Sequence, residues 1–439
     1  MGESHAAGDE PEGAGRPDDR RSGEGESDSM GSLADVEYPS LRRALQRLGP
    51  TFVVGAAIIG PGSVTLSSIA GSQFGYGLLW VLALSGLFAV VYVEMGARFG
   101  IVSERTFLGT VQHRYGRGVA VAVSILLGAV ILGASTGNIL GASIALEVLT
   151  GVDPVIWGTV VAAVTVAFVW LRDIYQRLEV VVLLLVGVML VSFVGTATLT
   201  GFSPSRAATG LVPSVPSQAA LVIAVAIVAS YFNLATPIVQ SYLVREKGYD
   251  RTDLGTAAYD SVAGYAVVGL LLVAILVVAA EVLGPQGVVV DSAAAMARQL
   301  EPLVGSNASL LFGLGLLGAS LSSVVATSLT GAVTVADGLG YEWRMDCRPT
   351  KAIATAAVTG AWALSIGAQL LGRNPVDTLV LAQVSLVVGT PVFGALLLVV
   401  LNDEDAVAGF TNTLPRNVLA VLGYLLGLGV VVALLSSFL

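Results

Sequence analysis

Eleven apolar stretches dominate the sequence, and each could cross the roughly 30 Å hydrocarbon core of a membrane as a helix of about 20 residues. Of the 439 residues, 55% are hydrophobic and only 12% are charged. Because a water-soluble domain could not bury that much apolar surface, the sequence predicts an all-α polytopic membrane protein. The expected spans are residues 50–72, 77–97, 119–148, 154–171, 178–200, 217–244, 256–283, 307–338, 351–372, 375–401 and 415–438.

Basic residues alternate along the chain in a way that predicts its orientation. With the N-terminus in the cytoplasm, 19 of the 22 Lys and Arg residues fall in the N-terminal segment or in even-numbered connections, and only Arg206, Arg298 and Arg373 fall outside. Cytoplasmic connections of membrane proteins carry an excess of basic residues. We therefore expect eleven spans in the plasma membrane, with the N-terminus cytoplasmic and the C-terminus outside.

The first 40 residues differ in composition from the rest of the chain. Residues 1–37 hold eleven acidic residues and three arginines, which accounts for −8 of the formal net charge of −9. Few large apolar residues occur there, so we expect residues 1–40 to form a disordered acidic tail ahead of a transmembrane domain at 41–439. The tail lacks a basic segment followed by an apolar core, so it does not resemble a signal peptide.

Two of the expected spans are interrupted. The first contains Gly60, Pro61 and Gly62 near its middle, and the sixth contains Pro237 among several polar residues. Proline removes a backbone donor and disrupts a helix, and freed backbone groups in a membrane need protein or a wet cavity as partners. A simple kink would explain either break alone. Breaks five spans apart instead predict an inverted repeat of spans 1–5 and 6–10, with a binding site at the breaks and a peripheral eleventh span.

Several other function classes lack support in the sequence. Cys347 is the only cysteine, which excludes an internal disulfide and a cysteine metal cluster. No Lys-Ser or Lys-Thr follows Gly62, so the glycines are not a nucleotide-binding loop. The spans contain no His/Asp, His/Glu or Cys/His constellation. We expect neither an enzyme nor a cofactor, and no nucleic-acid partner; the partners expected are a transported ion and the lipid bilayer.

Six motifs are spread along most of the chain: GPGSVTLSSIAGSQFGYGLLW from residue 60, ARFGIVSER from 97, YQRLE from 175, VPSVPS from 212, GASLSS from 318 and LAQVSL from 381. In their order and spacing they resemble motifs of the NRAMP (natural resistance-associated macrophage protein) family of divalent metal transporters. The resemblance covers about residues 48–438. It implies a LeuT-like fold of five plus five helices in an inverted repeat, with helices 1 and 6 broken, and transport by alternating access.

The resemblance also implies a site, which this sequence has altered. The family's first-span Asp and Asn, which coordinate the ion, correspond to Gly60 and Ser63. The sixth-span Met and its neighbouring carbonyl correspond to Asn233 and Ser230, whereas a register anchored on Pro237 would place Thr236 on the Met. Only the tenth-span glutamine is retained. The expected substrate- or ion-binding residues are therefore Gly60, Ser63, Ser230, Asn233, Thr236 and Gln383, with Ser63, Asn233 and Gln383 as metal ligands.

Such a site would contain only oxygen donors and no formal charge. A Met thioether favours transition metals, and Mg²⁺ or Ca²⁺ sites usually include a carboxylate. A neutral site is compatible with a largely hydrated metal ion of the Mn, Fe or Mg class, with a monovalent ion, or with a small organic solute on the same scaffold. A homologue that does not transport is a further alternative.

Proton coupling is not supported by the residues of the spans. The family's acidic pair in span three, proposed for proton movement, falls on Ser135 and Asn138. We find no titratable residue at any span centre, and we expect the acids near the span ends to be solvated or in local ion pairs, with Glu94 and Asp260 as the candidates for a gating role. These acids are Glu94, Glu147, Glu179, Asp260, Glu281 and Asp337. We therefore predict weak or no proton coupling.

Overall fold

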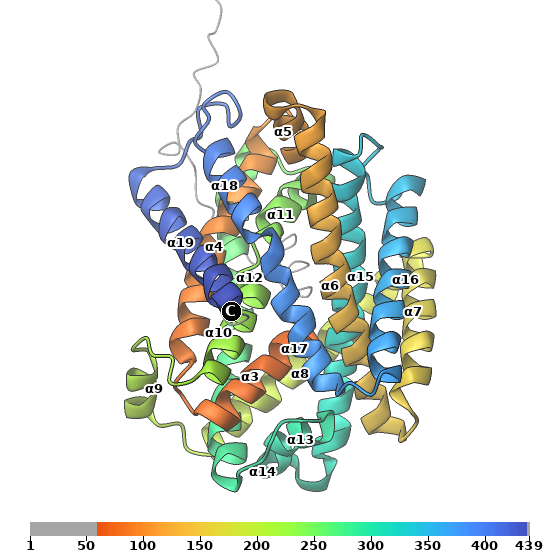
Figure 1. Ribbon diagram of the computed structural model, residues 1–439, viewed down its shortest axis with the longest axis vertical. Helices are drawn as coiled ribbons and strands as arrows, with labels where there is room; N and C mark the ends of the chain where they lie inside the picture. Colours follow the sequence, from red (N-terminus) through yellow and green to blue (C-terminus); the bar gives the residue numbers. More distant parts are fainter. Residues whose placement is uncertain (1–58, 437–439) are drawn as a thin grey trace, which may run out of the picture.

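The structure is a computed structural model that describes residues 59–436, with only the backbone described at residues 172–183. Within that part of the chain every regular element is helical, which confirms the all-α class (Figure 1). The longer helices are α3 (Pro61–Phe74), α4 (Leu79–Val102), α5 (Phe107–Tyr115), α6 (Arg117–Thr150), α7 (Pro154–Trp170), α8 (Arg172–Leu199), α9 (Pro204–Gly210), α10 (Gln218–Tyr231), α11 (Ala235–Glu246), α12 (Leu254–Val278), α15 (Ala308–Gly338), α16 (Arg348–Leu370), α17 (Pro375–Ser385), α18 (Thr390–Val400) and α19 (Leu414–Ser436). The short helices α13 (Ala293–Ala297) and α14 (Glu301–Val304) lie in one connection.

Each of the eleven predicted spans contains helix in its described part. By length and apolar composition, eight helices of the described chain can cross a membrane, or nine if the bent pair Leu184–Leu199 and Pro204–Gly210 is one span. The helix α7 is a shorter apolar helix, and only the second half of the first predicted span lies among the described residues. A polytopic helical membrane protein is therefore confirmed, while the count of eleven stays a prediction. The acidic tail and the side chains of the YQRLE motif lie outside the described residues.

Glycines bring α11 close to α4. A Cβ added to Gly96 would lie 2.1 Å from the backbone oxygen of Pro237, and one added to Gly100 would lie 2.3 Å from that of Ser241. Small residues four apart let helix backbones approach in this way, which is a common packing solution inside membranes. This contact fixes α11, and with it one side of the break in the sixth span.

The second half of the first span begins where the break was predicted. The helix α3 begins at Pro61, and Gly60 precedes it in an extended conformation with φ −101° and ψ 173°. Proline is well placed at the first position of a helix because its missing N–H would have no partner there anyway.

The break in the sixth span differs in position from the one assigned to Pro237. The helix α10 ends at Tyr231, and α11 begins at Ala235, so the unwound residues are 232–234. Pro237 lies in the first turn of α11, where the absence of an N–H removes no helical hydrogen bond. Pro237 therefore lies in the first turn of the second half-helix, and the unwound backbone ends three residues before it.

A further interruption was not predicted from the sequence. The tenth span is divided by a 3-10 turn at Leu386–Gly389, between α17 and α18. This turn follows Gln383 by three residues, so a third irregular backbone segment lies close to the candidate site.

The connections between the helices lie at the two ends of the bundle. One end carries α5 and the α18–α19 connection, and the other carries α9, α13 and α14 (Figure 1). Arg98, which was expected in a connection, lies instead inside α4 and is only 1% exposed. It contacts Glu94 at 3.3 Å and donates to the Phe410 carbonyl and to Asn412, while Arg416 approaches Glu94 at 3.6 Å. Arg98 and its three direct partners, Glu94, Phe410 and Asn412, are called the Arg98 cluster below.

Two of the acids near the span ends, Asp260 and Asp337, are enclosed by the protein. Asp260 is fully buried in α12. Asp337, near the end of α15, accepts hydrogen bonds of 2.6 Å from Thr106 and from Tyr242. Asp260 is therefore not a solvated charge, whereas Glu94 has the predicted local ion pairs.

Candidate functional site

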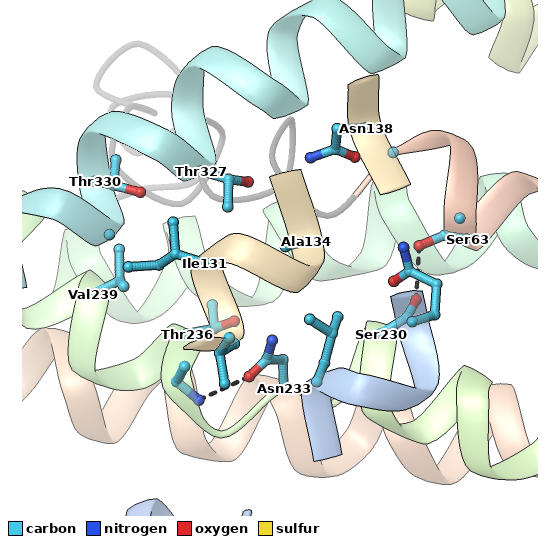
Figure 2. Close-up of a pocket in the computed structure, with 17 residues that line it drawn as sticks. Ser63, Ile131, Ala134, Asn138, Ser230, Asn233, Thr236, Val239, Thr327 and Thr330 are labelled. Carbon is cyan, nitrogen blue, oxygen red and sulfur yellow. Dashed lines mark hydrogen bonds between the residues drawn. The ribbon is translucent and has the colours of Figure 1, made fainter. Parts of the chain in front are cut away.

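The two helix breaks meet at one cavity. Its volume is about 100 Å³, measured as the space open to the centre of a water-sized sphere. That is several times the roughly 10–15 Å³ that one water needs. All six predicted binding residues line it: Gly60, Ser63, Ser230, Asn233, Thr236 and Gln383. The walls come from α3, α6, α10, α11, α15 and α17, so both halves of the expected repeat contribute (Figure 2).

A pair of serines joins the two broken spans at the cavity wall. Ser63 at the start of α3 and Ser230 near the end of α10 have their hydroxyl oxygens 2.9 Å apart (Figure 2). Ser63 is 5% exposed and Ser230 is 8% exposed, so the pair is shielded from bulk solvent. A ligand held between α3 and α10 would meet hydroxyl oxygens that are already oriented by each other.

Gln383 extends from α17 over the start of α3. A Cβ added to Gly62 would lie 2.1 Å from the Gln383 Nε2 atom, and one added to Gly137 would lie 3.0 Å from it. Glycine at position 62 is therefore required for the carboxamide to occupy this place. Gln383 is 6% exposed, and its carboxamide makes no hydrogen bond within the described chain, so its polar atoms are available to a ligand or to water.

Asn233 and Thr236 both face the cavity, so the two alignment registers considered for the sixth span lead to the same site. The Asn233 Oδ1 atom accepts a 2.9 Å hydrogen bond from the backbone N–H of Ala235, the first residue of α11. A carbonyl oxygen has two lone pairs, so one acceptor position and the amide N–H₂ group are left for a ligand. Thr236 hydrogen-bonds with Tyr265.

Three polar residues of the cavity were not among the predicted binding residues. Asn138 on α6 and Thr327 and Thr330 on α15 line the wall beside the helix breaks (Figure 2). Asn138 had been considered only as the position of a family acid. The sequence did contain a signal for it, because an amide in the middle of an apolar span is costly unless it faces a partner or a cavity.

The cavity has no charged wall. None of its lining residues within the described chain is acidic or basic, and residues 59–436 contain no cluster of three His, Cys, Asp or Glu side chains that could hold a metal ion. Fixed partial charges come instead from helix ends. The starts of α3 and α11 present the positive ends of their dipoles, and the end of α10 presents a negative one.

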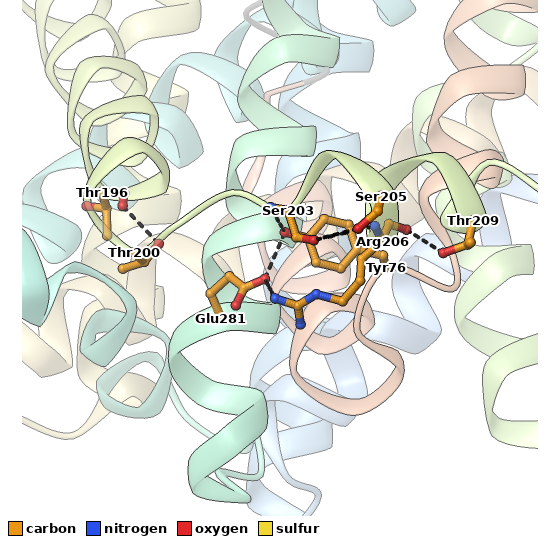
Figure 3. A network of polar contacts seen from close by, with 8 residues as sticks. All are labelled: Tyr76, Thr196, Thr200, Ser203, Ser205, Arg206, Thr209 and Glu281. Atoms are coloured by element: carbon orange, nitrogen blue, oxygen red, sulfur yellow. Dashed lines mark hydrogen bonds and ion pairs between the residues drawn. The ribbon is translucent and has the colours of Figure 1, made fainter.

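A separate polar cluster, made of Tyr76, Arg206 and Glu281, closes the end of the molecule that carries α9. Glu281 accepts a 2.8 Å hydrogen bond from Tyr76 and forms a 2.6 Å ion pair with Arg206, whose guanidinium lies 5.3 Å from the centre of the Tyr76 ring (Figure 3). Burial and the adjacent Glu281 raise the pKa of the Tyr76 hydroxyl above 10.0. This cluster ties α9 to the segment after α3 and to the turn after α12.

The same end also contacts α3 directly. Gln299 lies between α13 and α14 and is fully buried, and its Nε2 atom donates a 2.8 Å hydrogen bond to the Ser68 hydroxyl of α3. The second half of the broken first span is therefore held from outside the cavity as well as at its start.

A helical membrane protein with a polar cavity between two broken helices has the architecture of a secondary transporter. Two solved structures share its fold. A mutant of the Eremococcus coleocola manganese transporter matches with a TM-score of 0.75 at 21% identity, over 92% of this chain and 90% of that one. MhsT in complex with L-phenylalanine matches with a TM-score of 0.59 at 18% identity, over 89% of this chain and 98% of that one.

Sequence comparison gives the family. The model for natural resistance-associated macrophage protein-like proteins matches residues 51–437, and the chain belongs to this family. The divalent metal cation transporter MntH of Deinococcus radiodurans is 27% identical over 412 residues, covering 91% of this chain and 90% of that protein. The divalent metal cation transporter MntH of Mycobacterium tuberculosis is 28% identical over 389 residues, which cover 87% of this chain and 88% of that protein. Members of this family are transporters and not enzymes.

Proposed function

We propose that this protein moves a metal cation across the membrane by alternating access, through the cavity between α3 and α10–α11. The observation that carries the proposal is the convergence of both helix breaks on one polar cavity. Membership of a family whose relatives are named divalent metal cation transporters supports a metal as the substrate. We assign Ser63, Asn233 and Gln383 as ligands, with Gly60, Ser230 and Thr236 completing the site.

The chemistry of the wall favours a cation that keeps part of its water shell. Its ligands are hydroxyl and carboxamide groups, without a thioether or a carboxylate. Removing all water from a divalent ion at a neutral site is costly, and Mg²⁺ in particular dehydrates reluctantly. A cavity of about 100 Å³ has room for an ion together with several waters. Amide and hydroxyl groups can bind both the ion and those waters.

We propose that transport has weak or no coupling to protons. A proton pathway at membrane depth needs a chain of titratable groups. The described lining of the cavity contains none. We therefore expect flux at pH 5.5 and pH 7.5 to agree within about twofold, and substrate-driven acidification of the vesicle interior would contradict this part of the proposal.

The charge distribution supports a cytoplasmic N-terminus. Among the basic residues of the described chain, only Arg206, Arg298 and Arg373 lie in connections on the α9 side. Since cytoplasmic connections are enriched in Lys and Arg, we place the α5 end in the cytoplasm and the α9 end outside, in a plasma membrane.

The test is metal flux into proteoliposomes that contain the full chain, with Mn²⁺, Mg²⁺ and Ca²⁺ compared. We expect saturable flux of at least one of them. Asn233→Ala should reduce that flux roughly tenfold, because a hydrogen-bonding group next to a charge contributes about 1.5–3 kcal/mol. The matched control is Asn402→Ala, since Asn402 is exposed and pairs with Asn417 far from the cavity.

A second candidate is a transporter of a monovalent ion or a small organic solute on the same scaffold. The uncharged cavity wall favours this candidate, because such substrates need no carboxylate. Absence of flux for all three divalent ions, from protein shown to be folded, would contradict metal transport. Counterflow of Na⁺, K⁺ or neutral amino acids would then identify this alternative, and a failure of all of them would favour a homologue that does not transport.

A further inference from the structure

Asn138 is a polar residue of the cavity wall that was not among the predicted binding residues. It lies on α6 and is 4% exposed, and its side chain points toward the start of α3 (Figure 2). Its carboxamide forms no hydrogen bond with any described residue. Buried amides are normally hydrogen-bonded, so an unpaired one at a cavity wall indicates a group kept for water or a ligand.

The Asn138 side chain occupies the space that a side chain at position 60 would need. A Cβ added to Gly60 would lie 2.8 Å from the Asn138 Oδ1 atom and 3.1 Å from the Ser323 hydroxyl. The space beside the Gly60 Cα atom, where any larger residue would place its side chain, is therefore filled by the carboxamide from α6. A side chain at position 60 and the present position of Asn138 exclude each other.

The same arrangement occurs on the other side of Pro61. There the Gln383 carboxamide fills the space beside Gly62, as described above. Pro61 itself packs against Gly141 of α6, where an added Cβ would lie 2.0 Å from a Pro61 ring carbon. At the start of α3, Pro61 is thus flanked by two glycines without side chains. The spaces beside these glycines are filled by the carboxamides of Asn138 and Gln383, which belong to other helices.

We propose that Asn138 is a substrate ligand that occupies the place of a first-span side chain, and that it sets the charge of the site. This inference rests on the proposed function, because the substrate is taken to be a cation. The Asn138 oxygen would bind the ion or one of its waters opposite Gln383. Since a carboxamide is neutral, the site binds divalent ions more weakly than a carboxylate at the same place would.

The experiment measures Mn²⁺ binding to the purified full-length protein by isothermal titration calorimetry. Asn138→Ala should weaken binding roughly tenfold, and Asn138→Asp should strengthen it by about tenfold or more, because a unit negative charge is added beside the ion. The matched control is Ser143→Ala on the same helix. Ser143 is buried and donates to the Ile139 carbonyl, away from the cavity, so binding should change less than about twofold.

A second variant tests the competition for space without adding charge. Gly60→Ala should weaken Mn²⁺ binding in the wild-type background, because the new methyl group displaces the Asn138 carboxamide. In the Asn138→Ala background the same change should have a smaller effect, since the displaced carboxamide is gone and only the Ser323 hydroxyl remains close to the new methyl group. This non-additivity is not expected of two independent structural defects. It also provides a test if Asn138→Asp does not fold.

The outcomes separate this inference from the proposed function. If wild-type protein binds and transports Mn²⁺ but Asn138→Ala and Asn138→Asp bind it with unchanged affinity, the role of Asn138 is overturned and the proposed function stands. If the folded wild-type protein neither binds nor transports Mn²⁺, Mg²⁺ or Ca²⁺, the proposed function is overturned and the ligand role with it. Weaker Mn²⁺ binding by Asn138→Ala together with stronger binding by Asn138→Asp supports both the ligand role of Asn138 and the proposed function.

Discussion

The cavity and the Arg98 cluster are both buried among helices, but their polar groups differ in charge and in pairing. In the Arg98 cluster a guanidinium that is 1% exposed has a carboxylate, a backbone carbonyl and an amide oxygen as partners. Around the cavity the described side chains are neutral, and the carboxamides of Asn138 and Gln383 have no protein partner within residues 59–436. Full pairing indicates a structural role, whereas unpaired groups at a cavity wall indicate a binding role.

This difference gives a physical criterion for assigning roles. Removing a member of the fully paired cluster leaves other buried groups without partners, so its cost appears as lost stability. Removing an unpaired cavity group breaks no protein hydrogen bond, so its cost should appear in binding and transport. Four experiments test this distinction, from the largest expected effect to the smallest.

Arg98→Ala should give the largest loss of stability. It leaves Glu94, Asn412 and the Phe410 carbonyl without their shared partner, and breaking a buried ion pair from one side costs about 3–5 kcal/mol. Thermal unfolding in detergent measures the effect. Arg416→Ala is the control, because Arg416 is 28% exposed and should contribute less than about 1 kcal/mol. Equal effects of the two variants would contradict the comparison.

Gly62→Ala should damage both the fold and the site. The added methyl group would meet the Gln383 carboxamide at 2.1 Å, and such overpacking costs about 1–3 kcal/mol. Because Gln383 must move, Mn²⁺ flux should fall roughly tenfold. Gly187→Ala on α8 is the control: an added Cβ there meets nothing within 4 Å, so stability should be unchanged or should rise by about 0.5–1 kcal/mol.

Gln383→Ala should separate function from stability. Its carboxamide has no hydrogen bond to lose within the described chain, so the free energy of unfolding should change by only about 1 kcal/mol or less. Proteoliposome flux should nevertheless fall roughly tenfold. A loss of stability as large as that of Arg98→Ala, without loss of flux, would show that unpaired cavity groups do not mark the binding site.

Tyr76 should give the smallest effect, visible at high pH. Its neutral hydroxyl donates to Glu281, and the pKa of Tyr76 is raised above 10.0 by burial and by this carboxylate. Its contribution, about 1 kcal/mol, is therefore fully present below pH 10 and is lost as the pH rises through the higher folded-state pKa. Unfolding measured from pH 8 to 11 should show this decline in the wild type. Tyr76→Phe should lack that part of the decline, and identical profiles would refute the assignment.

The sequence alone determined the features that depend on local composition and backbone chemistry. The apolar runs predicted the class of helical membrane proteins, because the length and hydropathy of each run decide whether it can cross a membrane. The break at Gly60–Gly62 was predicted because proline and glycine act on their own backbone. The motifs also indicated the family and the residues Ser63, Asn233 and Gln383, which the structure brings to one cavity.

Only the tertiary structure decided which groups meet. Ser63 and Ser230 are 167 positions apart, and no local pattern states that their hydroxyls touch. The burial of Arg98 depends on partners more than 300 residues later in the chain. The place of Asn138 beside Gly60 depends on how α6 packs against α3. Helix faces are chosen by close packing between distant segments, and that choice decides which amides remain unpaired at the cavity.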